Sequence, residues 1–373
     1  MKKINFIVSI IILFFASALA QEKKNDIPIE QSYAGYKYKV VVPDLDIPWA
    51  FTWLPDGSML INEKEGTLLH YKDGKKITIK NVPKVYTQGQ GGLLDIELHP
   101  DYKNNGWIYF TYSSTIGNGN GGNTTLSRAK LSGDALTNIE LLYKATPNTT
   151  SPYHFGSRIE FDNECLVYFS VGERYNREQN PQDINRDGGK IYRLNDDGSI
   201  PKDNPFINKS GAKKAIYSYG HRNPQGMAKH PKTGKIWIHE HGPRGGDEIN
   251  IINKGANYGW PIITYGINYG GSKITNITKK QGMEQPVYYW TPSIAPSGMS
   301  FVTSPLFPEL HNTLLVGSLK FQYLEALTFK DNKVIKRERL FDNLGRMRCV
   351  RQGPDGYIYL AIEDLGIVKV FPK

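Results

Sequence analysis

The sequence has 373 residues and a formal net charge of +10, but only two cysteines, Cys165 and Cys349. Two cysteines do not make a disulfide framework in a chain of this length, so the core must hold the fold, whether the two thiols are free or paired. The lysines and arginines are scattered, without a basic run or a nucleic-acid motif, which argues against nucleic-acid binding.

The first segment has the pattern of a secretory signal peptide. Lys2 and Lys3 precede an apolar run, and the small residues "ASALA" precede Gln21. The apolar run is too short to favour a membrane span, which needs about 20 residues, so an uncleaved anchor is the weaker alternative. We therefore predict a signal peptide over residues 1–20, an N-terminal extension over 21–36, and a mature protein that is periplasmic or secreted, without a membrane span.

The rest of the chain repeats one pattern, a turn followed by an alternating apolar strand. It occurs six times: "PDGSMLINEK" at 55, "PDYKNNGWIYFTYS" at 100, "DNECLVYFSVG" at 162, "PKTGKIWIHEHG" at 231, "PELHNTLLVGSLK" at 308 and "PDGYIYLAIED" at 354. A repeat of about 40 to 50 residues that contains turns and short strands is typical of propeller blades. We predict an all-β, six-bladed β-propeller over residues 37–373, closed by "YKYKVVVPDL" joining the last blade. Two stacked sandwiches would not explain the repeat.

Polar stretches stand beside these strands, in the loops that propellers place around the mouth of the central channel, where function usually lies. In chain order they are "QGQGGLLDIELHPD" (88–101), "SPYHFGSRIEFD" (151–162), "SYGHRNPQGM" (218–227), "HGPRGGDEIN" (241–250), "YYWTPSIAPSG" (289–298), "GSLKFQYLEAL" (317–327) and "GRMRCVRQGPDG" (345–356). We expect the active site there.

Arg346 and Arg348 are two residues apart, so on a strand both side chains face the same way. Two guanidinium groups on one face repel each other unless an anion lies between them. With Lys320 they would suit a ligand with several carboxylates. Solvated strand charges are the alternative.

His154 is the best candidate base, because imidazole accepts a proton near neutral pH. The adjacent Arg222 and Asn223 could stabilise a developing oxyanion. Each of these motifs also has a structural interpretation: a histidine in a loop, and a turn held by asparagine and proline.

The loop 241–250 combines carboxylates with backbone carbonyls, the ligands that calcium prefers. Gly242 and Pro243 could direct their carbonyls to the channel, while Glu248 and the carbonyl of Tyr258 could bind a second, structural ion. His239 and His241 could chelate a transition metal, but no third histidine or cysteine lies nearby in the sequence.

In order and wording these stretches resemble the soluble PQQ-dependent sugar dehydrogenases, and most closely the periplasmic aldose sugar dehydrogenases. The motifs are "GQGGLLD", "YGHRNPQG", "EHGP…DEIN…GANYGWP", "GSLK" and "GRMR…GPDG", and the likeness runs from about Ile47 to the C-terminus. Together they are highly specific, although each alone is weak.

The resemblance implies roles for residues of this chain. Gln90, His154, Arg222 and Asn223 would surround sugar and quinone, with His154, Arg222 and Gln90 acting in catalysis. The PQQ carboxylates would be bound by Lys320, Arg346 and Arg348, with Thr291 and Ser293 lining the pocket and Trp290 one position away from the family's wall. Gly242 and Pro243 would bind the calcium at PQQ, and Glu248 and Tyr258 the second calcium.

The resemblance implies a PQQ- and calcium-dependent oxidoreductase that converts aldoses to lactones. His154 would take the anomeric hydroxyl proton while hydride passes to PQQ, and the electrons would go on to an unknown acceptor. The glucose dehydrogenases of the family place Asp before this His, where this chain has Tyr153, so the partner of His154 is open. A monomer or homodimer is expected. The alternatives are a calcium-dependent, lactonase-like propeller hydrolase and a non-catalytic sugar-binding propeller.

Overall fold

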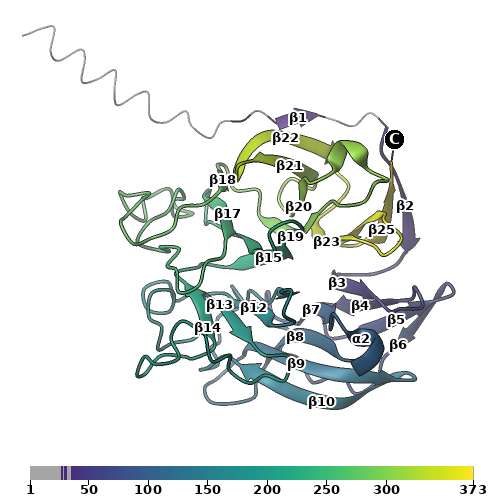
Figure 1. Ribbon diagram of the computed structural model, residues 1–373, viewed down its shortest axis with the longest axis horizontal. Helices are drawn as coiled ribbons and strands as arrows, with labels where there is room; N and C mark the ends of the chain where they lie inside the picture. Colours follow the sequence, from purple (N-terminus) through teal and green to yellow (C-terminus); the bar gives the residue numbers. More distant parts are fainter. Residues whose placement is uncertain (1–26, 28, 32–34, 373) are drawn as a thin grey trace, which may run out of the picture.

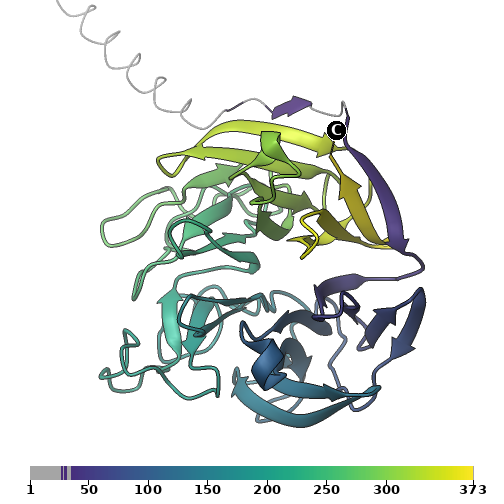
Figure 2. The same ribbon diagram turned by 45° about the vertical axis from the view of Figure 1, so that its right-hand side comes forward.

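A computed structural model describes residue 27, residues 29–31 and residues 35–372, and it shows six sheets arranged around a central axis (Figures 1 and 2). Each blade holds four antiparallel strands that are consecutive in the chain, except that the sixth takes one strand from the start of the chain; the sheet of the fifth blade has β1 as an additional, parallel strand. The predicted six-bladed β-propeller is therefore confirmed. The predicted signal peptide over 1–20 lies outside the described residues.

The blades follow one another in chain order, each from its innermost to its outermost strand. Blade 1 is β3 (Pro48–Trp53), β4 (Met59–Glu63), β5 (Leu68–Lys72) and β6 (Lys75–Thr78). Blade 2 is β7 (Leu93–Leu98), β8 (Ile108–Ser114), β9 (Asn123–Ser132) and β10 (Ala135–Lys144). Blade 3 is β11 (Ile159–Phe161), β12 (Val167–Val171), β13 (Lys190–Leu194) and β14 (Ile216–Tyr219).

The second half of the ring has the same order. Blade 4 is β15 (Pro224–Lys229), β16 (Ile236–Glu240), β17 (Asp247–Ile251) and β18 (Tyr288–Trp290). Blade 5 is β19 (Pro296–Phe301), β20 (Leu314–Ser318), β21 (Leu324–Lys330) and β22 (Lys333–Phe341). Blade 6 is β23 (Met347–Gln352), β24 (Ile358–Ile362), β25 (Gly366–Phe371) and β2 (Lys37–Val42). Among the described residues the helical elements are α2 (Tyr102–Asn105) and a 3₁₀ turn, Pro308–Leu310.

The sixfold sequence pattern corresponds to the second strand of every blade: β4, β8, β12, β16, β20 and β24. These strands are almost wholly buried because blades pack on both of their faces. The predicted closure is also confirmed, since β2 pairs antiparallel with β25 from Lys37 opposite Phe371 to Val42 opposite Ile367 (Figure 1). A further strand, β1 (Ile29–Gln31), runs parallel to the outer strand β22.

Apolar side chains fill the spaces between neighbouring blades. One cluster joins the first two blades and the last through residues such as Phe51, Ile96 and Ala361, all fully buried. Burial of this kind stabilises the fold by roughly 25 cal/mol per Å² of apolar surface. The two cysteines are unpaired: Cys349 is buried and Cys165 is half-buried. Among the described residues, no helix is long and apolar enough to cross a membrane.

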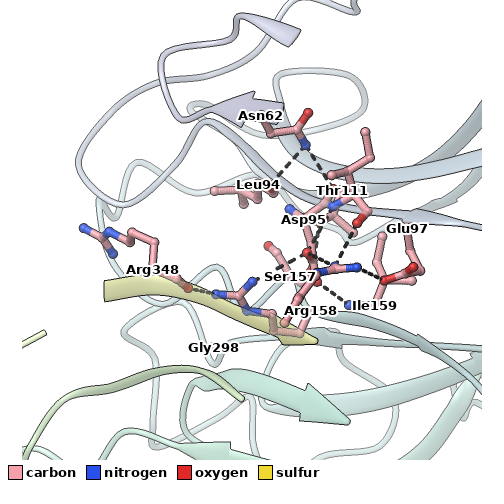
Figure 3. Close-up of polar contacts among 12 residues, drawn as sticks. Asn62, Leu94, Asp95, Glu97, Thr111, Ser157, Arg158, Ile159, Gly298 and Arg348 are labelled. Atoms are coloured by element: carbon pink, nitrogen blue, oxygen red, sulfur yellow. Dashed lines mark hydrogen bonds and ion pairs between the residues drawn. The ribbon is translucent and has the colours of Figure 1, made fainter. Parts of the chain in front are cut away.

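One arginine, Arg158, occupies the centre of the ring (Figure 3). It precedes β11 of blade 3, and its guanidinium reaches a residue of each of the other five blades. The partners are the Trp49 ring (3.9 Å), the Asp95 carboxylate (3.5 Å), the Gln225 carbonyl (2.8 Å), the Ser297 hydroxyl (3.4 Å) and the Arg348 carbonyl. Arg351 adds ion pairs to Asp95 and Glu97 below it. This network closes the channel beneath the site described next.

Candidate active site

A cavity of about 620 Å³ opens at the end of the channel where the innermost strands begin. Loops from most blades contribute to it, which is why stretches far apart in the sequence meet there. Its lining includes the predicted residues Gln90, Asn223, Pro243, Ser293, Lys320, Arg346 and Arg348, together with Trp49, Gln225 and His241. The volume is in the range of cofactor and small-ligand pockets, roughly 300–1,000 Å³.

Arg346 and Arg348 do point to one side, as their spacing predicts, and the anion between them is Glu363. Its Oε2 accepts a hydrogen bond from Arg346 Nε at 2.7 Å, and its Oε1 accepts one from Arg348 Nε at 2.5 Å. Lys320 lies on the same cavity and is exposed. Three cations thus face the cavity with one carboxylate among them, which leaves an excess of positive charge for an acidic ligand.

His154 lies in an adjoining cavity of about 290 Å³, which also contains Arg222 and shares Pro243 with the first. Its Nδ1 is 2.5 Å from Oε1 of Glu173, and both side chains are buried. Burial, with the positive charges of Arg222 and Arg174, holds the pKa of His154 well below its usual value. Burial raises the pKa of the Glu173 carboxyl to about 7. The imidazole is therefore neutral at neutral pH, as a general base must be.

The backbone that carries His154 is held in an unusual conformation, with φ of 58°. A histidine in the left-handed region is uncommon, and such strain persists only where surrounding contacts fix it. Gln90 Oε1 accepts a hydrogen bond from the His154 amide at 2.8 Å. Arg174 donates to the carbonyls of Tyr153 and Ser151 and lies over the Phe155 ring. These contacts fix the direction of the imidazole.

Arg222 and Asn223 occupy the next loop. Arg222 Nη1 donates to the carbonyls of His241 (3.0 Å) and Gly242 (3.3 Å), and its backbone N–H donates to Glu240 Oε2 at 2.6 Å. The Asn223 side chain accepts a hydrogen bond from the Gly156 amide at 3.0 Å. Arg222 is thus attached to the loop 241–250, and the carbonyl of Gly242 faces its guanidinium.

Asp247 organises the loop 241–250. Its buried carboxylate accepts hydrogen bonds from the Gly242 amide and the Ser293 hydroxyl on one oxygen, and from the Ile294 and Ala295 amides on the other. Burial raises the pKa of this carboxyl to about 6. The first of the two adjacent acids therefore ties two site loops together, and only the second, Glu248, is left for a cation.

A cavity of about 10 Å³, the size of one ion or water, lies behind Gly242. Glu240, Glu248 and Tyr258 line it. The Asn250 side-chain N–H₂ donates to both carboxylates, at 3.3 and 3.1 Å. Burial, and next the charge of Glu240, raise the pKa of Glu248 to about 8. Asn250 Oδ1 is buried and has no hydrogen-bond partner among the described residues. Two buried carboxylates that line one small cavity fit a hard divalent cation.

His239 and His241 do not converge on one point. His239 Nε2 lies 3.2 Å from the Gly298 carbonyl, and His241 Nε2 lies 2.7 Å from the Pro296 carbonyl. Nε2 of each ring thus contacts a backbone oxygen of a different residue, which disfavours a transition-metal site that His239 and His241 share.

Thr291 and Trp290 lie away from the cavity. Thr291 is exposed and lines a separate groove, whereas Ser293, two residues later, lines the cavity. Trp290 is buried, with its indole N–H 3.3 Å from Glu325. The indole that does form a cavity wall is Trp49, from the innermost strand of blade 1.

Three acids of the site were not foreseen from the sequence: Glu173, Glu240 and Glu363. A signal for them existed, because each lies at or just after the end of the second strand of its blade. The glutamates of "SVGE", "IHE" and "AIE" occupy similar places in the repeat, and each contacts a different group of the site: His154, Asn250 and the Arg346–Arg348 pair.

Comparisons with known proteins agree with this geometry. Residues 45–368 match the family model described as Glucose / Sorbosone dehydrogenase. The chain is 42% identical over 345 residues to the aldose sugar dehydrogenase YliI of Escherichia coli K12, covering 90% of this chain and 92% of that protein. The crystal structure of the soluble aldose sugar dehydrogenase from Escherichia coli, in its apo form, superposes with a TM-score of 0.86 at 40% identity, covering 91% and 100% of the chains.

Another similar structure has a bound ligand. The PQQ-bound form of aldose sugar dehydrogenase from Streptomyces coelicolor superposes with a TM-score of 0.73 at 27% identity, covering 91% of this chain and 99% of that one. The family match over residues 45–368 covers most of the propeller.

Proposed function

The chain belongs to the glucose/sorbosone dehydrogenase family, and from that premise we propose that it oxidises aldose sugars at the anomeric carbon to lactones, using PQQ and calcium. The observation that carries the proposal is that Lys320, Arg346 and Arg348 converge on one cavity whose neighbour contains the buried His154–Glu173 pair. A hydrolase or a sugar-binding propeller has no need of the three cations.

The donor set fits PQQ, a flat aromatic molecule with three carboxylates. The three cationic side chains would hold its carboxylates, with Glu363 keeping the two arginines aligned. Trp49 provides an aromatic wall, and Gln90, Asn223 and Ser293 provide polar groups at the edge. Thr291 lies outside this wall, so we propose no contact for it. When bound, PQQ supplies a quinone that can accept two electrons.

His154 would act as the base that accepts the proton of the sugar. With Glu173 ionised, Nδ1–H of His154 donates to the carboxylate and the lone pair of Nε2 is free to accept the anomeric hydroxyl proton. Glu173 would thus be the carboxylate partner of His154, since this chain has Tyr153 where the glucose dehydrogenases of the family have Asp. Arg222, in the same cavity, supplies positive charge where the sugar oxygen becomes negative. Gln90 orients the base through its contact with the His154 amide.

Calcium is proposed at two places. Pro243 lines the 620 Å³ cavity and Gly242 lines the 10 Å³ cavity, and the carbonyls of these two residues would hold the ion next to the cofactor. Glu248 and the carbonyl of Tyr258 would hold the second ion in the small cavity with Glu240. The second ion would neutralise the negative charges of Glu240 and Glu248.

The decisive experiment uses the purified protein with PQQ, calcium and an artificial electron-acceptor dye. We expect dye bleaching that requires an aldose and is absent without PQQ. Hydrolysis of lactones without any bleaching would instead support the hydrolase. Export to the periplasm and transfer of electrons to an unidentified acceptor are part of the same proposal, and the sequence of the first 20 residues supports the former.

A further inference from the structure

A groove of about 850 Å³, larger than the cofactor cavity, lies between blades 4 and 5. Its walls come from β18, from the segment just before β21, from β22 and the residues after it, and from Tyr265 of the loop before β18. A single loop, residues 291–295, separates it from the cofactor cavity: Thr291, Pro292 and Ile294 line the groove, whereas Ser293 and Ala295 line the cavity. The groove therefore begins directly beside the proposed active site.

We propose that this groove binds a neutral carbohydrate chain, so that sugar units beyond the oxidised reducing end are held between blades 4 and 5. The binding site stands on the groove alone. Its connection with oxidation of the reducing end rests on the proposed function.

Flat aromatic rings form nearly half of the groove wall. Tyr265 and Tyr289 stack with ring centroids 3.7 Å apart and an angle of 9°. Phe321 and Tyr323 are parallel within 3°, with centroids 6.1 Å apart, and Phe321 is 40% exposed. A pyranose ring presents a face of C–H groups that packs against the negative face of an aromatic ring. Tyr323 itself is buried, so the two surfaces open to successive sugar units are the Tyr265–Tyr289 pair and the Phe321 ring.

Polar groups stand beside these rings. Arg339 lies over the Tyr323 ring, at 4.6 Å from its centroid, and forms an ion pair with Asp342 at 3.2 Å. Its Nε is buried and has no hydrogen-bond partner among the described residues. Asn343 is exposed at the edge. Guanidinium, carboxylate and amide groups together can donate to and accept from the paired hydroxyls of a sugar.

The charge balance of the groove selects a neutral ligand. Arg337 is paired with Glu325, and Arg339 is paired with Asp342, so neither arginine offers uncompensated charge to a phosphate or an acidic polysaccharide. A lipid or an apolar peptide would bury the ion pair without compensation, which is costly. A ligand with apolar faces and many hydroxyl groups satisfies both conditions.

The test is calorimetric titration of the protein without PQQ or calcium, using glucose and the α-1,4- and β-1,4-linked glucose tetrasaccharides. We expect one tetrasaccharide to bind at least about tenfold more tightly than glucose, a difference of about 1.4 kcal/mol, since its further sugar units add stacking contacts. Tyr289→Ala and Phe321→Ala should remove most of this gain, and Tyr289→Phe should retain it. Ile335→Ala is the matched control, because Ile335 is a 55% exposed apolar residue of β22 outside the groove.

Equal affinity for glucose and both tetrasaccharides, or tetrasaccharide binding that survives both alanine substitutions, would overturn the proposal. Since the titration needs no turnover, it separates the groove from the proposed function: tetrasaccharide binding in a protein that bleaches no dye would refute the dehydrogenase and leave the groove standing. In the active enzyme, Tyr289→Ala should raise KM for the tetrasaccharide while KM for glucose stays unchanged.

Discussion

Nδ1 of His154 lies 2.5 Å from Oε1 of Glu173, a residue 19 positions later that reaches the histidine from the end of the second strand of blade 3. The state of this pair decides which imidazole nitrogen carries the proton. When Glu173 is ionised, Nδ1 holds the proton and Nε2 can act as a base; when Glu173 is protonated, it donates to Nδ1 and the proton moves to Nε2.

The first prediction follows from this proton position. Because burial raises the pKa of Glu173 to about 7, kcat/KM for aldose oxidation should fall as the pH drops through about 7. In Glu173→Gln this acid limb of the pH profile should be absent, and kcat/KM should be much lower at every pH. A pH–rate profile of both proteins measures it, and an unchanged limb in the variant would assign the titration to another group.

A second prediction concerns His154 itself. His154→Gln should lower turnover by about 10²–10⁴-fold, since it removes the only base of its cavity with a free ring nitrogen, while PQQ still binds. Turnover in the dye assay and PQQ binding by equilibrium dialysis are the two measurements. Turnover equal to that of the unchanged protein would exclude His154 from the mechanism.

The sequence predicted the ring and its closure because both depend on patterns that are local: a turn, then a strand of alternating residues. It also placed Arg346 and Arg348 on one side, because i and i+2 on a strand share a face, and the family resemblance assigned Lys320, which lines the same cavity, to the same ligand. It did not single out Glu173 or Glu363: their place in the repeat was a signal, but their partners depend on which loops come together at the channel. The left-handed backbone of His154 is likewise fixed by contacts from distant loops.

The third prediction tests the cationic cluster. Glu363→Gln removes the charge that aligns Arg346 and Arg348, so it should weaken PQQ binding without abolishing it. Arg348→Leu should weaken binding more, by about 10–100-fold, because a charge-assisted hydrogen bond contributes roughly 1.5–3 kcal/mol. Titration of the apoprotein with PQQ compares the two. Tighter binding by Arg348→Leu would contradict the assignment of the cavity.

The fourth prediction concerns the small cavity of Glu240 and Glu248. Calcium at about 100 times its Kd should stabilise the protein by about 2.7 kcal/mol, measured as a rise in Tm after chelator-treated protein is resupplied. Glu248→Gln should abolish most of this rise and also raise the Tm of the metal-free protein, because it removes one of two close, buried carboxylates. A calcium-dependent Tm rise that is unaffected by Glu248→Gln would place the ion elsewhere.

A fifth prediction concerns Arg158, whose guanidinium reaches all the other blades. Arg158→Met should lower the free energy of unfolding by about 3–5 kcal/mol, because it leaves Asp95 with one cationic partner fewer in a buried place. Denaturant unfolding measures it, with Arg244→Met as the exposed control. A loss no larger than in the control would show that blade packing alone centres the ring.

The pairing of β2 with β25 has a consequence for the order of events when the polypeptide is made. The last sheet cannot be completed until the final strand, Gly366–Phe371, has left the ribosome and met a segment synthesised more than 320 residues earlier. Until then one edge of the wheel stays open and the channel mouth is incomplete. The channel mouth is therefore complete only after all six blades have been synthesised, and a nascent chain has no working site before β25 is made.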